Sequence, residues 1–169
     1  MTSVCYDSPI GPLRIAEEEG HIVEISFMEA DTRKEFKGTV AAAPKAKGKK
    51  KAETPPVIQA CIAELEAYFA GKLREFTVPI KLTGTDFRKK VWAALLTIPY
   101  GQTISYKQLA ERIGQPSAVR AVGGANHHNP VSIIVPCHRV IGASGTLTGY
   151  GGGLDNKAFL LELEKKAPI

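Results

Sequence analysis

The sequence predicts an α/β (α+β) N-terminal domain over residues 1–80, with a small β-sheet and a helix, and a mostly α C-terminal domain over residues 81–169. Short apolar runs separated by turn residues predict strands near the start of the chain. Apolar residues at helical spacing predict a helix opened by Pro55-Pro56 and further helices after residue 85. Two of these are short and joined by a glycine, which is typical of a helix-turn-helix.

The composition is that of an ordinary globular protein, with 44% hydrophobic and 23% charged residues in a chain of 169. Every apolar run is shorter than the roughly 18 residues that cross a bilayer, so we expect no membrane partner. The N-terminus lacks a basic segment followed by an apolar one, and three cysteines do not suggest a disulfide framework. We therefore expect a reducing compartment, either the cytoplasm or, in a eukaryote, the nucleus.

The net charge of +5 is unevenly divided along the chain. Residues 1–80 hold 11 Lys and Arg against 12 Asp and Glu, a charge of −1, whereas residues 81–169 hold 11 against 5, a charge of +6. A basic surface attracts polyanions such as nucleic acid, although a soluble surface without a specific partner is an equally good explanation of the charge alone.

Two turn clusters, Ser8–Pro12 and Glu19–His21, divide the first 28 residues. The apolar runs Leu13–Ile15 and Ile22–Phe27 predict strands of a hairpin or meander. Farther along, residues 41–54 are rich in Ala and Lys and predict a mobile loop, because like charges repel and little apolar surface is available to bury.

The helix from Pro56 is predicted to end at Gly71. Cys61 lies on its apolar stripe and Cys5 lies in the first strand, so both are expected to be structural. Phe76–Ile80 predicts an extended link into the second half. The stripe comprises Val57, Ile58, Cys61, Ile62, Leu65, Tyr68 and Phe69.

The helix-turn-helix is predicted between Ser105 and Val122. Ser105 and Gln108 have the spacing of a capping box, which starts the first helix, and Gly114 ends it. Pro116 is expected to start the second helix, which would be the recognition helix. This second helix is rich in small residues, namely Ala118, Ala121, Gly123, Gly124 and Ala125, and it carries one arginine, Arg120.

Helices are also predicted on either side of this pair. The first spans Asp86–Ile98, is capped by Thr85 or Asp86, and buries Phe87, Val91, Trp92 and Leu95. The second is capped by Asp155, with Phe159, Leu160 and Leu163 in the core. Glu164 follows Leu160 by four residues, so its carboxylate is either at the edge of that core or paired inside it.

A reactive site is predicted where Ile133–Val135, a short apolar strand, is stopped by Pro136. Cys137 and His138 follow at once, and a thiol beside a base or a cation can act as a nucleophile. The alternative is that Cys137 is a small buried hydrophobic residue. Neighbouring residues of a strand also point to opposite faces, so the two side chains need not touch.

These residues carry a resemblance to a known family. Pro136-Cys137-His138-Arg139-Val140, with Asn129-Pro130 upstream and Gly149-Tyr150-Gly151-Gly152-Gly153-Leu154 downstream, resembles the O6-alkylguanine-DNA alkyltransferases. The resemblance is dense from Thr85 to Glu164 and looser from Ser8 to Phe76. It implies a ribonuclease H-like N-terminal domain and a winged-helix-like C-terminal domain that binds DNA and transfers alkyl groups.

The resemblance also implies roles for individual residues. Cys137 would attack the alkyl group, His138 would take the thiol proton through a water, and Glu164 would orient that histidine. Asn129 would hold the turn before the active site, and Tyr106 would press on the target phosphate and donate a hydrogen bond to the departing guanine. Arg120 would bind DNA by filling the place of the flipped nucleotide. The other DNA contacts would be Tyr106, Ser105, Ala121, Gly123 and Arg139. The substrate pocket would be lined by Pro136, Val140, Tyr150 and Gly151.

The implied activity is direct-reversal DNA repair, in which each molecule irreversibly takes one alkyl group from O6-alkylguanine in double-stranded DNA. The resemblance implies a monomer without a cofactor or metal, and it leaves open O4-alkylthymine as a substrate and cooperative assembly on DNA. Zinc-binding relatives use cysteines and histidines near the N-terminus, but only Cys5 and His21 are present there. The pair His127-His128 departs from the family pattern.

Three other functions remain open from the residues. A Cys-His-Glu hydrolase would use the same side chains but would turn over and would not need a basic helix pair. A non-catalytic sensor of alkylated DNA would lack the nucleophile, whereas Cys137 is present. A helix-turn-helix regulator that reads the major groove would carry more long polar side chains on its second helix.

Overall fold

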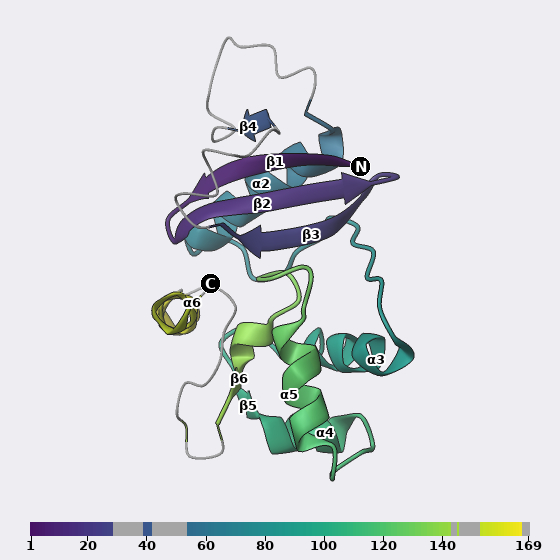
Figure 1. The fold of residues 1–169 in the computed structure, drawn as a ribbon. Coiled ribbons are helices and arrows are strands. Elements are labelled where there is room, and N and C mark those ends of the chain that lie inside the picture. Colours follow the sequence, from purple (N-terminus) through teal and green to yellow (C-terminus); the bar gives the residue numbers. More distant parts are fainter. Residues whose placement is uncertain (29–38, 42–53, 143–144, 146–152, 167–169) are drawn as a thin grey trace. The chain divides into compact units, whose positions relative to one another are not determined.

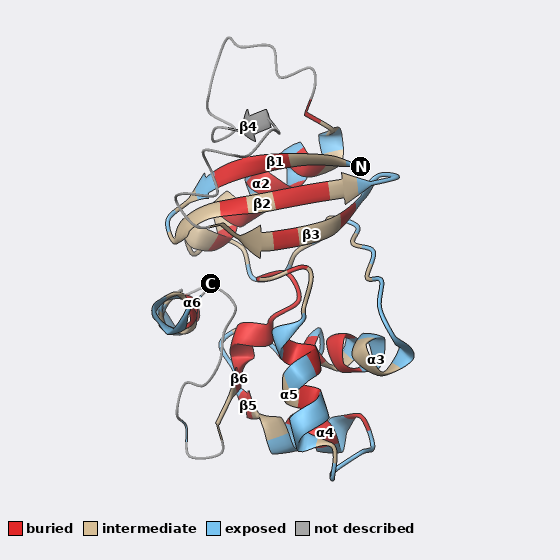
Figure 2. Ribbon diagram, in the orientation of Figure 1, coloured by how far each residue is buried: buried red, intermediate tan, exposed pale blue. Residues whose placement is uncertain are grey.

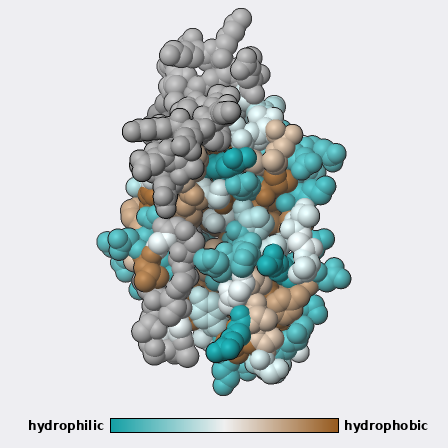
Figure 3. All heavy atoms as spheres, in the orientation of Figure 1, coloured by the Kyte–Doolittle hydropathy of each residue, from teal (hydrophilic) through white to brown (hydrophobic). Residues whose placement is uncertain are grey.

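A computed structural model of the chain describes residues 1–28, 39–41, 54–142, 145 and 153–166 (Figure 1). They form two compact units, Met1–Lys81 and Leu82–Lys166, which we describe separately as the N-terminal and C-terminal units. Hydrophilic side chains, in teal, and apolar ones, in brown, are interspersed on the face drawn in Figure 3. Within the described ranges, no helix is long and apolar enough to cross a membrane.

The N-terminal unit is built on a four-stranded sheet. Its strands are β1 (Thr2–Ser8), β2 (Gly11–Glu18), β3 (His21–Phe27) and β4 (Thr39–Ala41), in the order β3-β2-β1-β4. The first three form an antiparallel meander, which confirms the strands predicted around the two turns, and β4 runs parallel to β1. Ala41, predicted to begin the mobile loop, lies in β4, and residues 42–53 of that loop lie outside the described part.

One helix, α2 (Pro56–Phe69), packs against β2 and β3. Pro56 stands in its first turn, where the missing N–H costs nothing, and Gly71 follows its end with φ of 75°. Burial raises the pKa of the Cys61 thiol to about 12, which makes Cys61 an inert core residue, and Cys5 is equally buried. The core of this unit, red in Figure 2, joins Ile58, Cys61, Ile62, Leu65 and Tyr68 of the helix to Leu13, Ile15, Ile22 and Ile25 of the sheet.

The C-terminal unit is mostly helical, as predicted, and the two-unit α+β fold class is confirmed. Helices α3 (Asp86–Leu95), α4 (Tyr106–Arg112) and α5 (Val119–His127) pack on one another. A short parallel ladder joins β5 (Ile104–Ser105) to β6 (Val140–Ile141). The 3-10 turn η1 (Cys137–Arg139) and helix α6 (Leu154–Lys166) complete the unit.

The predicted helix starts are partly right. Thr85 caps α3 by accepting a hydrogen bond from the backbone of Arg88, and the capping box of Ser105 and Gln108 is present at the start of α4. The second helix of the predicted pair, α5, begins at Val119, three residues later than the predicted start at Pro116. Gly114 has a φ of 75° and ends the turn after α4, as expected of a residue that can adopt the left-handed conformation.

The predicted strand Ile133–Val135 is wrong. The backbone N–H of Ile134 bonds the carbonyl of Ser132 at 2.9 Å, and Ile133 between them has a φ of 74°, which is a γ-turn. A positive φ is unusual for a β-branched residue, and its cost of about 1–3 kcal/mol must be met by surrounding contacts. Ile133 is fully buried, so burial of its side chain supplies that compensation.

The predicted core face of α6 is also partly wrong. Phe159, expected inside, is 41% exposed, whereas Lys157 is fully buried together with Leu160 and Glu164. Asp155 lies inside the first turn of the helix instead of capping it. The buried face of α6 is therefore largely charged, and its charges must be satisfied within the unit.

We expect Gly84→Ala to lower the free energy of unfolding by about 1–3 kcal/mol, because a new Cβ cannot fit without displacing a core ring. That Cβ would lie 2.8 Å from Cη2 of the buried Trp92 ring. Denaturant unfolding followed by the fluorescence of Trp92, the single tryptophan, measures this directly.

Gly124→Ala is the matched control, because nothing lies within 4 Å of its new Cβ inside α5. Its stability should be unchanged or higher by up to about 1 kcal/mol, as for a glycine removed from a helix interior. Equal losses in both variants would contradict the packing argument.

Candidate active site

The segment that leads from α5 to Cys137 is held by two asparagines. Asn129 accepts a hydrogen bond from the N–H of Val131 at 3.0 Å and donates one to the carbonyl of Val135 at 2.8 Å. Asn126, at the buried side of α5, donates to the carbonyl of Cys137 at 3.5 Å. The turn before the thiol is thereby fixed at both ends.

Cys137 is a buried thiol, 5% exposed. Burial raises its pKa to about 11, although a hydrogen bond with Asn129 and the charge of Lys157 both act to lower it. At neutral pH this cysteine is therefore a thiol and not a thiolate. A nucleophilic role requires a base that removes the proton as the reaction proceeds.

His138 is a suitable base. Its Nε2 lies 2.7 Å from Oε2 of Glu164, and both side chains are buried. Because a carboxylate only accepts, Nε2 carries the hydrogen, which leaves Nδ1 as the nitrogen that can take a proton. Nδ1 is buried and has no hydrogen-bond partner among the described residues. Burial lowers the pKa of His138, although Glu164 acts against that shift, so the ring is neutral at pH 7.

Glu164 of α6 is surrounded by donors. Besides His138 it accepts hydrogen bonds from Nε of Arg139 at 2.8 Å, from Nη2 of Arg139 at 3.0 Å and from the backbone of Gly101 at 3.2 Å. Burial alone would raise the pKa of this carboxyl, but the bonds and charges of His138 and Arg139 hold it well below its usual range. The carboxylate is therefore ionised whenever the protein is folded near neutral pH.

Arg139 does not lie where a DNA contact was predicted. Its side chain is 8% exposed, makes a bidentate pair with Glu164 and donates to the carbonyl of Ile98 at 2.7 Å. A guanidinium committed in this way is not presented to a phosphate. The structure assigns it instead to fixing the carboxylate that orients His138.

Lys157 is the charged residue that sequence reasoning missed. It is fully buried on α6, its Nζ donates to the carbonyl of Val140 at 2.6 Å, and it lies 6.0 Å from the centroid of the Tyr106 ring. Burial lowers the pKa of Lys157, whereas Cys137 acts to raise it. The available signal was spacing, because Lys157, Leu160 and Glu164 recur at i, i+3 and i+7.

The other predicted DNA-binding residues lie at the start of α4 and on α5. Arg120 and Ala121 are exposed, and Tyr106 and Ser105 are half-buried at the start of α4. A Cβ added to Gly123 would lie 3.9 Å from the Tyr106 ring, so these two predicted residues are neighbours. Pro136 and Val140 are buried, and Tyr150 and Gly151 lie outside the described residues.

Two family models match the chain. The model described as 6-O-methylguanine DNA methyltransferase, ribonuclease-like domain, matches residues 1–82, and the DNA binding domain of the same family matches residues 86–166. The chain belongs to the 6-O-methylguanine DNA methyltransferase family. This confirms the resemblance drawn from the residues around Cys137.

Relatives in this family are similar over nearly their whole length. The methylated-DNA–protein-cysteine methyltransferase of Mycobacterium tuberculosis is 50% identical over 163 residues, which are 96% of this chain and 92% of the relative. That of Methanosarcina acetivorans is 47% identical, over 97% and 98% of the two chains. The crystal structure of Mycobacterium tuberculosis OGT in complex with DNA matches with a TM-score of 0.82 and 48% identity, covering 99% of this chain and 94% of that one.

No group of three or more His, Cys, Asp or Glu side chains that could hold a metal ion occurs among the residues that the structure describes.

We expect this methyltransferase to lose stability as the pH falls below about 6.5 because of His138. The folded state lowers the pKa of this ring, so below the ordinary histidine pKa of about 6.5 the unfolded chain binds a proton that the folded protein does not. Stability is therefore fully present above that pH and is lost as the pH falls. Denaturant unfolding followed by Trp92 fluorescence measures the loss.

His138→Gln should flatten this pH profile, whereas His21→Gln, which changes an exposed histidine of the N-terminal unit, should leave it as in the wild type. A profile of equal steepness in His138→Gln and wild type would mean that other groups cause the loss.

Proposed function

We propose that this protein repairs DNA by direct reversal, moving an alkyl group from O6 of guanine to Cys137 in one irreversible step. Membership of the methyltransferase family and the DNA complex of its Mycobacterium tuberculosis relative support DNA as the substrate. Each molecule acts once, because the product is a stable thioether.

The observation that carries the proposal is the hydrogen-bonded pair of His138 and Glu164, with Cys137 directly before His138 in the chain. Cys137 is a buried thiol with a raised pKa. In the neutral ring of His138, Nε2 is hydrogen-bonded to Glu164, and Nδ1 has no hydrogen-bond partner among the described residues. This is the order of groups that activates a nucleophile and then stabilises the charged base.

The step balances without a further reactant. The Sγ–carbon bond forms while the carbon–O6 bond breaks, and the electrons of that bond leave with the guanine. The thiol proton passes to Nδ1 of His138 and on to the departing guanine, which leaves neutral. Glu164, held by Arg139 and Gly101, stabilises the imidazolium that exists during the transfer.

The substrate base must leave the duplex to reach this site, because O6 cannot be attacked in line while the base is stacked. Flipping costs a few kcal/mol, less for a damaged and weakly paired base. We assign Arg120, exposed on α5, to the vacated position in the stack, and Tyr106 to the phosphate of the flipped nucleotide. The small residues Ala121 and Gly123 allow the α5 backbone to approach the DNA closely.

Mixing the protein with duplex DNA that holds one O6-methylguanine should add one methylene mass to the intact protein, mapped to Cys137. Cys137→Ala should bind the same DNA without any gain in mass, because the nucleophile is missing. Cys61→Ala is the matched control and should react as the wild type does, since its thiol is buried in the other unit. Binding without transfer by the wild type would indicate a sensor, and the absence of both would indicate a hydrolase.

Arg120→Ala should slow transfer from duplex DNA by about tenfold or more, because the flipped state loses the group that fills its place. Transfer from a free O6-alkylguanine base should change less than twofold, since that reaction needs no flipping. Lys72→Ala removes one exposed positive charge from the N-terminal unit and should leave both rates close to those of the wild type. Equal slowing on both substrates would assign Arg120 to the fold or to the reaction itself.

A further inference from the structure

We infer that His127, in the last turn of α5, contacts a DNA phosphate when its ring is protonated. This protein would therefore bind duplex DNA more tightly at mildly acidic pH. The inference rests on the proposed function, because it takes α5 to lie against DNA. It concerns a residue pair, His127 and His128, that the activity itself does not use.

His127 shares a helix face with Arg120. The two residues are seven apart on α5, which is two helical turns, so they point the same way. The opposite face carries the buried residues Val122, Ala125 and Asn126. Two turns span about 10 Å, or roughly three base-pair steps, so the two side chains can reach different phosphates of one duplex.

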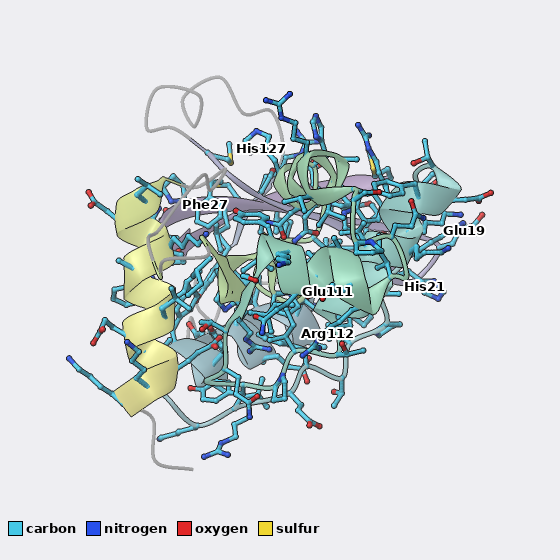
Figure 4. The ribbon with its side chains drawn as sticks, turned by 90° about the horizontal axis from the view of Figure 1, so that it is seen from below. Glu19, His21, Phe27, Glu111, Arg112 and His127 are labelled. Atoms are coloured by element: carbon cyan, nitrogen blue, oxygen red, sulfur yellow. The ribbon has the colours of Figure 1, made fainter. Side chains whose placement is uncertain are left out.

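The ring of His127 is exposed and uncommitted. Its contact is an edge-to-face arrangement with the His128 ring, whose centroid is 5.5 Å away, and it makes no hydrogen bond or ion pair with any described residue. In Figure 4, Glu111 and Arg112 of α4 are labelled well apart from it. The charged residues on the two helices that pack against α5 are Asp86, Arg88, Lys89 and Lys90 of α3 and Lys107, Glu111 and Arg112 of α4.

Five of these seven charges are positive, and within the described ranges neither carboxylate pairs with His127. A proton on His127 therefore adds to the net positive charge of these helices instead of neutralising a paired acidic group. Such a charge is stabilised best by an anion from outside the protein, and DNA phosphates are the anions that the proposed function brings to α5.

His128 has a different role. Its Nδ1 lies 2.7 Å from the carbonyl of Gly124, and since a carbonyl only accepts, this nitrogen carries the hydrogen. The ring thus caps the C-terminal end of α5, where unpaired carbonyls give a partial negative charge that repels phosphate. Protonation of His127 at the same end would offset this repulsion. Arg120 lies near the other end of the helix and is too distant to offset it.

The test is the affinity of the protein for an undamaged duplex at about pH 6 and about pH 8, which bracket the titration of histidine. Binding is measured by fluorescence anisotropy over a range of salt concentrations. We expect the wild type to bind about three- to tenfold more tightly at the lower pH, with the salt slope steeper by about one, as for one further phosphate contact.

Three variants separate the causes. His127→Gln should bind weakly at both pH values and His127→Arg tightly at both, because neither side chain titrates in this range. His21→Gln, in the N-terminal unit, should keep the pH response of the wild type.

A wild-type response that survives in His127→Gln would overturn the inference while leaving the proposed function in place. Failure of every protein to bind duplex DNA at either pH would overturn the proposed function as well. A response lost in His128→Gln and kept in His127→Gln would also overturn the assignment to His127.

Discussion

The carboxylate of Glu164 connects the elements of the C-terminal unit that surround His138. It joins α6 to η1 through His138 and Arg139, and to the turn after α3 through the backbone of Gly101. Arg139 extends this link to the carbonyl of Ile98. A carboxylate, a guanidinium and an imidazole are costly to bury singly, and together they satisfy one another. Because loss of one partner leaves the others buried and unpaired, the fold and the catalytic geometry depend on the same contacts.

This network explains how a cysteine can be both protected and reactive. Burial keeps Cys137 protonated, with its pKa raised to about 11. The resting protein therefore holds little thiolate, which is the form that reacts with oxidants and stray electrophiles. In the proposed mechanism, His138 takes the proton of Cys137 once a substrate fills the site. For a protein that spends its nucleophile in a single event, such restraint preserves the group until the correct base arrives.

Sequence periodicity predicted most of the regular structure and much of the site. The meander, α2, α3 and the capping box of α4 follow from alternation, helical spacing and local capping, which act over a few residues. The turn at Ile133 and the buried Lys157 were not predictable in this way. Both violate local preference, one with a positive φ and the other with a buried charge, and both are held by distant contacts: Ile133 by the core and Lys157 by the carbonyl of Val140. Arg139 was misplaced for the same reason, since its partner Glu164 is 25 residues away.

Under the proposed function, helix α5 links DNA binding to the reactive cysteine because its two faces make different contacts. The outer face carries Arg120 and His127, whereas on the inner side the carbonyl of Ala125 accepts a hydrogen bond from Trp92, and Asn126 donates to the carbonyl of Cys137. The last turn of the helix therefore touches the nucleophile's own backbone. Under the proposed function, this helix would hold Cys137 at a fixed distance from a base that is flipped beside Arg120. The proposed function also explains the small residues on the outer face, because longer side chains there would hold the helix, and with it Cys137, away from the DNA.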